Sequence, residues 1–385
     1  MRYPRDDAKL DRVRGLLADE GLDAVVVRAP DNVLYLTNFW GMKGYDACVF
    51  PREGEPVLIC LDASAEDAER NAWTADVRLF RGYDETDPRP PTARTLDAAL
   101  DAAREYGRVG LELSLGTQAS DRMVGEPTTF TKAWFDAFPA AADATPLLNR
   151  ARMIKTEQEV ERLRIANEIA AHAMEHVRGL LRPGMKESEA AAVWQGFVHG
   201  QGTARDDVEL ALPFSLVWAG KGIKTFTATA DLPVTEGEPV LFEIWVCADG
   251  YWADHTKNLV LGELKPEYAE LEEQLAHVYT CALHMCAHGQ SMAELDRTVR
   301  SGLAEMGYPG QPSHPICHGV GARAHEPPYP HQAAGGTVEE GMVLAVEPGV
   351  YWDGGGGLRM EDNFLITKDE AQKLSSFPDG IVACP

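Results

Sequence analysis

The sequence of 385 residues is short of positive charge and of long apolar runs. It has 36 lysines and arginines against 60 aspartates and glutamates, a formal net charge of −24. Nucleic acids and anionic membranes favour a basic surface, so we expect neither as a partner. No run of about 18 apolar residues occurs, so we expect no transmembrane helix.

Paired cysteines and nucleotide-binding loops are also missing. The seven cysteines are an odd, scattered set with no C-x-x-C pair, which argues against a structural zinc site and favours a reducing, cytoplasmic setting. No G-x-G-x-x-G or G-x-x-x-x-G-K-[ST] motif occurs, so a nucleotide site has no support. Apolar residues make up 45%, enough for a large core, and the length predicts two or three domains.

Residues 1–150 alternate between helical and extended patterns. DDAKLDRVRGLLADEG reads as an amphipathic helix ending at Gly21, and LDAVVVRA as a buried strand. DACVFPREGEPVLICL predicts two strands around a turn, and AEDAERNAW a helix. This alternation predicts a three-layer α/β domain.

Residues 151–385 predict a second domain of helices and strands. Thr156 and Glu159 form a capping-box pattern before a helix whose apolar spacing continues to Leu180, with Pro183-Gly184 ending it. Two further helices are expected, over about 187–198 and 266–288. Strands rich in valine, isoleucine, tryptophan and phenylalanine lie between and after them.

An Asp-Gly pair at 249–250 predicts a tight hairpin between the flanking segments. With that pair as the loop, Glu243 lies opposite Thr256. Alternation along a strand puts Asp254 on the Glu243 face, diagonal to it and about 7–8 Å away at Cα, and turns His255 to the other face. Two carboxylates so placed can converge on one cation.

A glycine-rich loop centred near Gly354 predicts a second hairpin. Reflection about that residue puts Glu347 opposite Glu361, since each lies seven residues away. Pro348 interrupts the ladder, so the register can differ by one residue. Arg359 lies two residues before Glu361 and shares its face, which gives a second carboxylate pair with an arginine beside it.

The segment CHGVGARAHEPPYPH, residues 317–331, adds histidines to these carboxylates. By itself it is either a metal-binding loop or a surface turn rich in histidine. Carboxylate-rich sites with one imidazole suit divalent Mn, Fe, Co or Zn. Two such ions about 3.5–4 Å apart would activate a water and polarise a carbonyl.

Four segments in chain order resemble the creatinase, prolidase and aminopeptidase P family: EIWVCADGYWADHTKN, HGVGARAHEPP, VEPGVY and LRMED. APDNVLYLTNFWG is similar to the family's N-terminal signature, and ARMIKTEQEVERLRIANEIA to the entry of its catalytic domain, so the resemblance covers nearly the whole chain. It implies an α/β creatinase-like domain over residues 1–150 and an α+β catalytic domain of the pita-bread fold over 151–385. It also implies a homodimer.

The resemblance implies a metal set. Asp254 and Glu361 would be carboxylates that bridge two divalent ions, with manganese among the candidates. His318 would be the single imidazole ligand. Glu347 would bind one ion and is a candidate proton shuttle.

Supporting roles follow from the same resemblance. His325 would contact the substrate or the tetrahedral intermediate. Arg359 would support Glu361 through a charge-assisted hydrogen bond. His314 and His331 need no role in the chemistry.

Two departures from the family's peptidases stand out. Those peptidases have an aspartate eleven residues before the bridging one; here the residue is Glu243, whose extra methylene can shift or empty one metal position. They also carry a histidine sixteen or seventeen residues before that first carboxylate, where this chain reads KTFTATAD around Thr227. Glu243 is therefore a metal ligand, a general base or a nucleophile.

Two enzyme functions stay open on the sequence. One is a divalent-metal hydrolase of a C–N bond in a dipeptide, resembling Xaa-Pro dipeptidase or aminopeptidase P; the retained ligands favour it. The other is a hydrolase or lyase of a small zwitterionic compound, in the manner of creatinase or ectoine hydrolase, with a reduced or absent metal site. Glu243 and the missing histidine favour this second function. A catalytically inactive binding protein would have no reason to keep four ligands.

Overall fold

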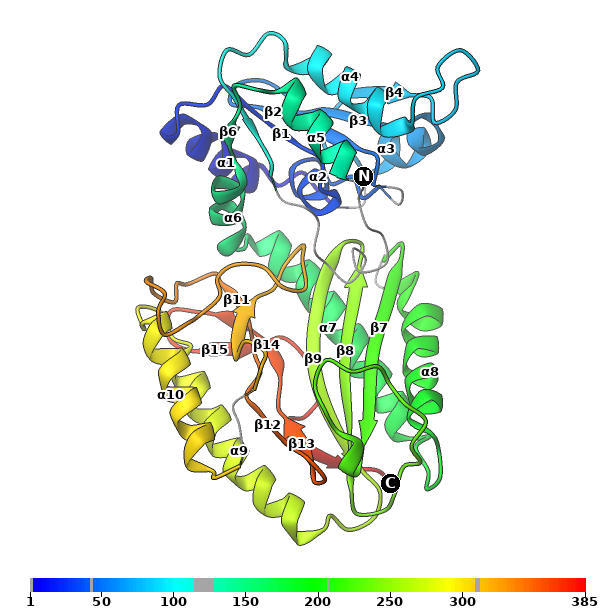
Figure 1. The fold of residues 1–385 in the computed structure, drawn as a ribbon, viewed down its shortest axis with the longest axis vertical. Coiled ribbons are helices and arrows are strands. Elements are labelled where there is room, and N and C mark those ends of the chain that lie inside the picture. The colour runs from blue at the N-terminus through cyan, green and yellow to red at the C-terminus, as the bar shows by residue number, and fades with distance from the viewer. Residues whose placement is uncertain (1–2, 42–43, 114–127, 206–207, 309–311) are drawn as a thin grey trace. The chain divides into compact units, whose positions relative to one another are not determined.

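The structure is a computed structural model that describes residues 3–41, 44–113, 128–205, 208–308 and 312–385. The chain divides into two compact units, Met1–Arg152 and Met153–Pro385. Figure 1 shows the elements of each.

The first unit is built on a six-stranded mixed sheet with the order β4-β3-β2-β1-β5-β6. β2 runs antiparallel to its neighbours β1 and β3, and the other pairs are parallel. The central strands are apolar without interruption because helices cover both of their faces. The strands are β1 (Ala24–Val27), β2 (Ala47–Pro51), β3 (Val57–Leu61), β4 (Asp76–Phe80), β5 (Val109–Leu111) and β6 (Ala142–Asp143).

Helices flank this sheet on both sides. α1, α2, α3 and α6 share one apolar cluster with one set of alternate strand residues, and α4 and α5 share another with the opposite set. The expected three-layer α/β arrangement is therefore confirmed. The helices are α1 (Asp7–Asp19), α2 (Pro30–Thr37), α3 (Ala65–Asn71), α4 (Pro91–Ala103), α5 (Thr128–Ala137) and α6 (Thr145–Met153).

The second unit holds two four-stranded sheets and a short hairpin. One sheet has the order β16-β9-β8-β7 and the other β10-β11-β14-β15. The first sheet comprises β7 (Ala211–Ala219), β8 (Pro239–Ala248), β9 (Tyr251–Val260) and β16 (Ile381–Ala383). The others are β10 (Cys317–Gly319), β11 (Val343–Val346), β12 (Gly349–Trp352), β13 (Gly356–Arg359), β14 (Asp362–Ile366) and β15 (Ala371–Lys373).

Each large sheet has its own pair of helices. α7 (Glu157–Arg178) and α8 (Glu187–Phe197) pack on the sheet of β8 and β9. α9 (Pro266–Met285) and α10 (Met292–Glu305) pack on the sheet of β11 and β14. Figure 1 shows the strands in the middle of this unit, with α8 on one side and α9 and α10 on the other.

The capping box before α7 is confirmed, because Thr156 accepts a bond from the Glu159 amide and the Glu159 carboxylate accepts one from the Thr156 amide. The predicted end of this helix is too late. α7 stops at Arg178, and Leu180 lies beyond it with 45% of its surface exposed. Gly179 is the C-cap, and its amide donates to the Glu175 carbonyl at 3.2 Å.

Helix α10 was not predicted, and α9 ends earlier than expected, at Met285. The signal for α10 was present in the sequence. Ser291 caps it by accepting the Glu294 amide, and Leu295, Val299 and Leu303 recur at helical spacing and are buried.

Candidate metal centre

Glu243 and Asp254 lie on one face of the β8–β9 hairpin, as predicted. Its turn has φ of 47° at Asp249 and 86° at Gly250, the left-handed conformation that an Asp-Gly turn adopts readily. The ladder pairs Glu243 with Thr256, so the predicted register is confirmed. Both carboxylates are nearly buried, Glu243 at 9% exposure and Asp254 at 1%.

Glu347 and Glu361 are brought together by the second hairpin. β12 pairs with β13 and β11 with β14, both in the register centred on Gly354. The two glutamates fall between these paired segments, each seven residues from Gly354, where Pro348 interrupts the ladder. An isolated bridge between Thr256 and Glu361 then joins this hairpin to the sheet of Asp254.

His318 lies on β10 and is fully buried beside these carboxylates. Its Nδ1 is 3.0 Å from the Gly319 carbonyl oxygen, which can only accept, so Nδ1 carries the proton. Nε2 then presents its lone pair towards Glu347 Oε1 at 3.4 Å and Asp254 Oδ2 at 3.7 Å. A lone pair held towards carboxylates by a backbone contact is the usual orientation of a metal-binding histidine.

Three overlapping groups of side chains have ligand atoms within 4.8 Å of one another: Asp254, His318 and His325; His318, Glu347 and Glu361; and Glu243, Asp254 and Glu361. Within the described part of the chain, Asp254 Oδ1 and His318 Nε2 are buried and have no hydrogen-bond partner. Buried polar atoms of this kind need a partner, and a divalent cation would satisfy all of them. The residues present therefore fit a metal.

The electrostatics of the cluster point the same way. Burial raises the pKa of Glu347 and Glu361 well above the usual value, and the charge of Asp254 raises both further. Burial and, to a lesser extent, the charge of His325 lower the pKa of His318 to about 3. The buried Glu347 and Glu361 carboxylates are thus destabilised as anions, and a divalent cation would stabilise their charged forms.

His325 reaches Asp254 from a loop after β10. Its Nε2 lies 3.0 Å from Asp254 Oδ2, and its side chain is 34% exposed. Burial opposes its protonation, but the contact with Asp254 overcomes this and raises the pKa of His325. The imidazole can therefore meet both the cluster and a molecule that enters from solvent.

A buried ion pair fixes the loop that carries His325. Lys155 Nζ donates to Glu326 Oε1 at 2.9 Å, with 0% and 2% of the two side chains exposed. The Glu326 amide donates to the Gly319 carbonyl, and a Cβ on Gly319 would lie 2.6 Å from the Glu326 carbonyl oxygen. Only glycine permits this close approach. The pair was not foreseen, because 171 residues separate its partners.

Arg359 does more than support Glu361. Its Nε donates to Thr256 Oγ1 at 2.6 Å and lies 3.6 Å from Glu361 Oε2, and Nη1 donates to the Tyr351 hydroxyl at 2.9 Å. Nη2 forms an ion pair with Glu243. One buried guanidinium therefore orients carboxylates from both hairpins.

His314, for which the sequence analysis expects no role in the chemistry, lies beside the candidate ligand Glu347. The side chain is buried, with Nδ1 3.0 Å from Glu347 Oε2 and Nε2 3.1 Å from the Tyr351 hydroxyl. Its position four residues before His318 was a usable signal, but a proline follows it and obscures the local pattern. His331, in contrast, is exposed, in agreement with the prediction.

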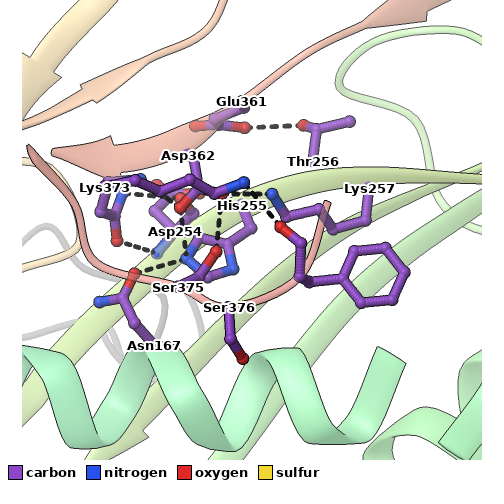
Figure 2. Close-up of polar contacts among 12 residues, drawn as sticks. Asn167, Asp254, His255, Thr256, Lys257, Glu361, Asp362, Lys373, Ser375 and Ser376 are labelled. Carbon is purple, nitrogen blue, oxygen red and sulfur yellow. Dashed lines mark hydrogen bonds and ion pairs between the residues drawn. The ribbon is translucent and has the colours of Figure 1, made fainter. Parts of the chain in front are cut away.

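The opposite face of the same strands holds a second buried polar cluster (Figure 2). Asp362 pairs with Lys257, lies 3.1 Å from Lys373 Nζ and accepts a bond from Ser375 at 2.7 Å. His255, predicted to face away from the metal ligands, does so and lies 3.5 Å from Asp362 Oδ1. Because Asp362 and His255 directly follow two candidate ligands, this cluster holds the backbone of both.

The segment that lacks the expected histidine contributes no imidazole. Thr227 is exposed, and Thr229 Oγ1 accepts a backbone bond from β7 at 2.8 Å. The neighbouring Phe226 lies edge-on to His314, with ring centroids 6.3 Å apart. The group that this segment brings to His314 is therefore aromatic.

Comparison with known proteins identifies the family of both units. Residues 161–368 match the family model described as metallopeptidase family M24, and residues 9–154 match the creatinase/prolidase N-terminal domain. An Xaa-Pro dipeptidase of Lactobacillus delbrueckii subsp. lactis is 28% identical over 374 residues, 94% of each chain.

Solved structures resemble the chain over nearly its full length. An Xaa-Pro dipeptidase from Bacillus anthracis superposes with a TM-score of 0.80 at 22% identity, covering 98% of this chain and 99% of that one. An X-Pro aminopeptidase from Thermotoga maritima gives 0.77 at 22% identity, covering 94% and 98%. The two-domain fold with a pita-bread second unit is thereby confirmed. Among the described residues, no helix is long and apolar enough to cross a membrane.

Proposed function

Because this chain belongs to metallopeptidase family M24, a family of divalent-metal peptide-bond hydrolases, we propose that it is an Xaa-Pro dipeptidase. The observation that carries the proposal is the set of three overlapping carboxylate and imidazole groups between the two hairpins. The full-length likeness to a curated Xaa-Pro dipeptidase supports the substrate class.

Two ions, with manganese as the first candidate, would be held by five residues. Two carboxylates, Asp254 and Glu361, each belong to two of the three groups and would be shared between the ions. His318 and Glu347 would complete one position, and Glu243 the other. When bound, the metal supplies the Lewis acidity that lowers the pKa of a water and polarises the scissile carbonyl.

The side chains of the site would perform the remaining work. Glu347, between His318 and His314, takes the proton of the attacking water and passes it to the leaving nitrogen. His325, the most exposed of these groups, donates a hydrogen bond to the oxyanion. Arg359 keeps Glu243 and Glu361 in place.

The setting and assembly of the enzyme form part of the proposal. The seven cysteines, all among the described residues, are unpaired, which supports a reducing cytoplasmic compartment. We infer a homodimer from the resemblance to the family, and light scattering of the purified protein tests it.

The deciding experiment combines metal content with a substrate panel. Elemental analysis before and after chelation should give about two equivalents of Mn, Fe, Co or Zn per chain, and Xaa-Pro dipeptides should be cleaved only with metal. Asp254→Asn should lose both properties, while Asp353→Asn, at an exposed aspartate, should lose neither.

Two results would count against the proposal. Near-zero metal with no gain on its addition would sink the mechanism. Turnover of cyclic or guanidino compounds, with no cleavage of dipeptides, would favour the non-peptidase function instead.

A further inference from the structure

Phe226 is a large apolar side chain that the fold leaves in water. It is 66% exposed, and its backbone φ is 56°, a conformation that L-residues other than glycine rarely adopt. Exposure and an unusual backbone both disfavour phenylalanine on structural grounds. Strained backbone conformations cluster at ligand-binding and active sites, which points to a binding role for this residue.

The segment that carries Phe226 is fixed on both sides. Ile223, three residues earlier, is 1% exposed and packs with the apolar residues of β7 and β8. On the other side of Phe226, the Thr229 hydroxyl accepts a hydrogen bond from the Val217 amide of β7, and the Ala230 amide donates to the buried Glu187 carboxylate at 3.1 Å. The aromatic ring is therefore presented from an anchored loop.

The ring lies at the rim of the candidate metal centre. It meets His314 edge-on, with centroids 6.3 Å apart and planes at 78°. His314 in turn contacts Glu347 and the Tyr351 hydroxyl. A substrate whose scissile bond lies over the carboxylates would bring one of its own groups to the exposed face of Phe226.

We propose that Phe226 is a specificity-determining residue that selects dipeptides by an apolar side chain. Aromatic faces bind aliphatic groups and the proline ring without hydrogen bonds, and they disfavour anionic side chains, which lose their hydration against the electron-rich face. The group of the dipeptide that contacts Phe226 is either the side chain of the N-terminal residue or the proline ring, because both are apolar. The inference rests on the proposed dipeptidase function.

The test compares Phe226→Ser and Phe226→Leu with the wild-type protein on four dipeptides: Leu-Pro, Gly-Pro, Asp-Pro and Gly-Gly. The Leu-Pro to Gly-Pro ratio reports the N-terminal side chain, and the Gly-Pro to Gly-Gly ratio reports the proline ring. Phe226→Ser should raise KM for the apolar substrates by about tenfold with kcat little changed. Phe226→Leu should restore most of the preference. Leu232→Ser, at a 46% exposed leucine on the same connection, should not change it.

Equal effects of Phe226→Ser on all substrates, or none, would overturn the inference and leave the dipeptidase function intact. A shift to monomers with the preference retained would also overturn it, because Phe226 would then be a subunit contact.

Calorimetric binding of the dipeptides to chelated protein separates the two proposals. If no dipeptide is hydrolysed, the dipeptidase function fails. The wild-type protein should bind Leu-Pro more tightly than Gly-Pro, or Gly-Pro more tightly than Gly-Gly. Loss of that difference in Phe226→Ser would still support the apolar contact. Absence of any such difference would end it.

Discussion

Replacing Asp362 by asparagine should destabilise the second unit more than any single change of its lysine partners. Asp362 is fully buried and is the shared anion of Lys257, which is 1% exposed, and Lys373, which is 24% exposed. Asparagine keeps the shape but removes the charge, so the buried Lys257 ammonium keeps only the more distant Asp379 carboxylate, at 3.7 Å. This cost is much larger than the loss of one hydrogen bond.

The magnitude follows from the burial of the partners. Breaking a buried ion pair from one side costs about 3–5 kcal/mol, which lowers the Tm of a unit of this size by roughly 6–20 °C. Lys373→Met should cost only about 1–2 kcal/mol, because Asp362 keeps Lys257 and Ser375 and the lysine is partly solvated. Lys368→Met, at an exposed lysine, should stay within about 0.5 kcal/mol.

Urea unfolding at pH 7 and near pH 3 measures these differences. Burial raises the pKa of Asp362, but Lys257, His255 and Lys373 together hold it well below its usual range. A carboxylate whose pKa is depressed by folding stabilises the folded state above its unfolded pKa of about 3.9, and this stabilisation is lost as the pH falls through the folded pKa. The difference in unfolding free energy between wild type and Asp362→Asn should therefore become smaller in acid. A gap that is independent of pH, or no larger than that of Lys373→Met, would refute the reasoning.

Three further predictions concern the metal centre and the first unit. The Glu243→Asp variant should bind the more weakly held metal ion several-fold more tightly, as measured by calorimetry. The shorter side chain would lose its ion pair with Arg359 and lie closer to Asp254. Weaker metal binding, or loss of all turnover, would instead assign Glu243 a specific role. Arg359→Lys should lose about 10–100-fold in metal affinity, because an ammonium cannot make the four guanidinium contacts; unchanged affinity would contradict this. Burial raises the pKa of the Asp46 carboxyl to about 6. The protonated carboxyl therefore contributes its full stability to the first unit below its usual pKa of 3.8, and this contribution is lost as the pH rises through 6. The Asp46→Asn variant should thus be more stable than the wild type in the first unit by up to about 3 kcal/mol at pH 7.5, and by little at pH 4. Amide hydrogen exchange measures this difference. Equal effects at the two pH values would contradict a raised pKa for Asp46.

The metal-ligand geometry was predictable wherever a turn set the register. An Asp-Gly turn and a loop centred on Gly354 have local sequence signals, and counting from them placed Glu243 beside Asp254 and Glu347 opposite Glu361. These counts succeed because the side-chain period of a strand is two, so a correct turn determines every face.

The parts that were missed depend on contacts between distant segments. His314 has its role because the fold brings it to Glu347, and no local pattern records that. The Arg359 contact with Glu243 joins two hairpins, and the pairing of Lys257 with Asp362 joins β9 to β14. Helix α10 is different, because its capping serine and apolar spacing were visible and were overlooked.

The Lys155–Glu326 pair determines where the chain can be cut to isolate the catalytic half. The family model begins at residue 161, and a fragment starting there would keep every candidate metal ligand. It would, however, remove the Lys155 ammonium from the buried Glu326 carboxylate and so weaken the support of the loop that carries His325. A fragment starting at Met153 retains the pair. The functional border of the catalytic half therefore lies before Lys155, upstream of the border that similarity alone would draw.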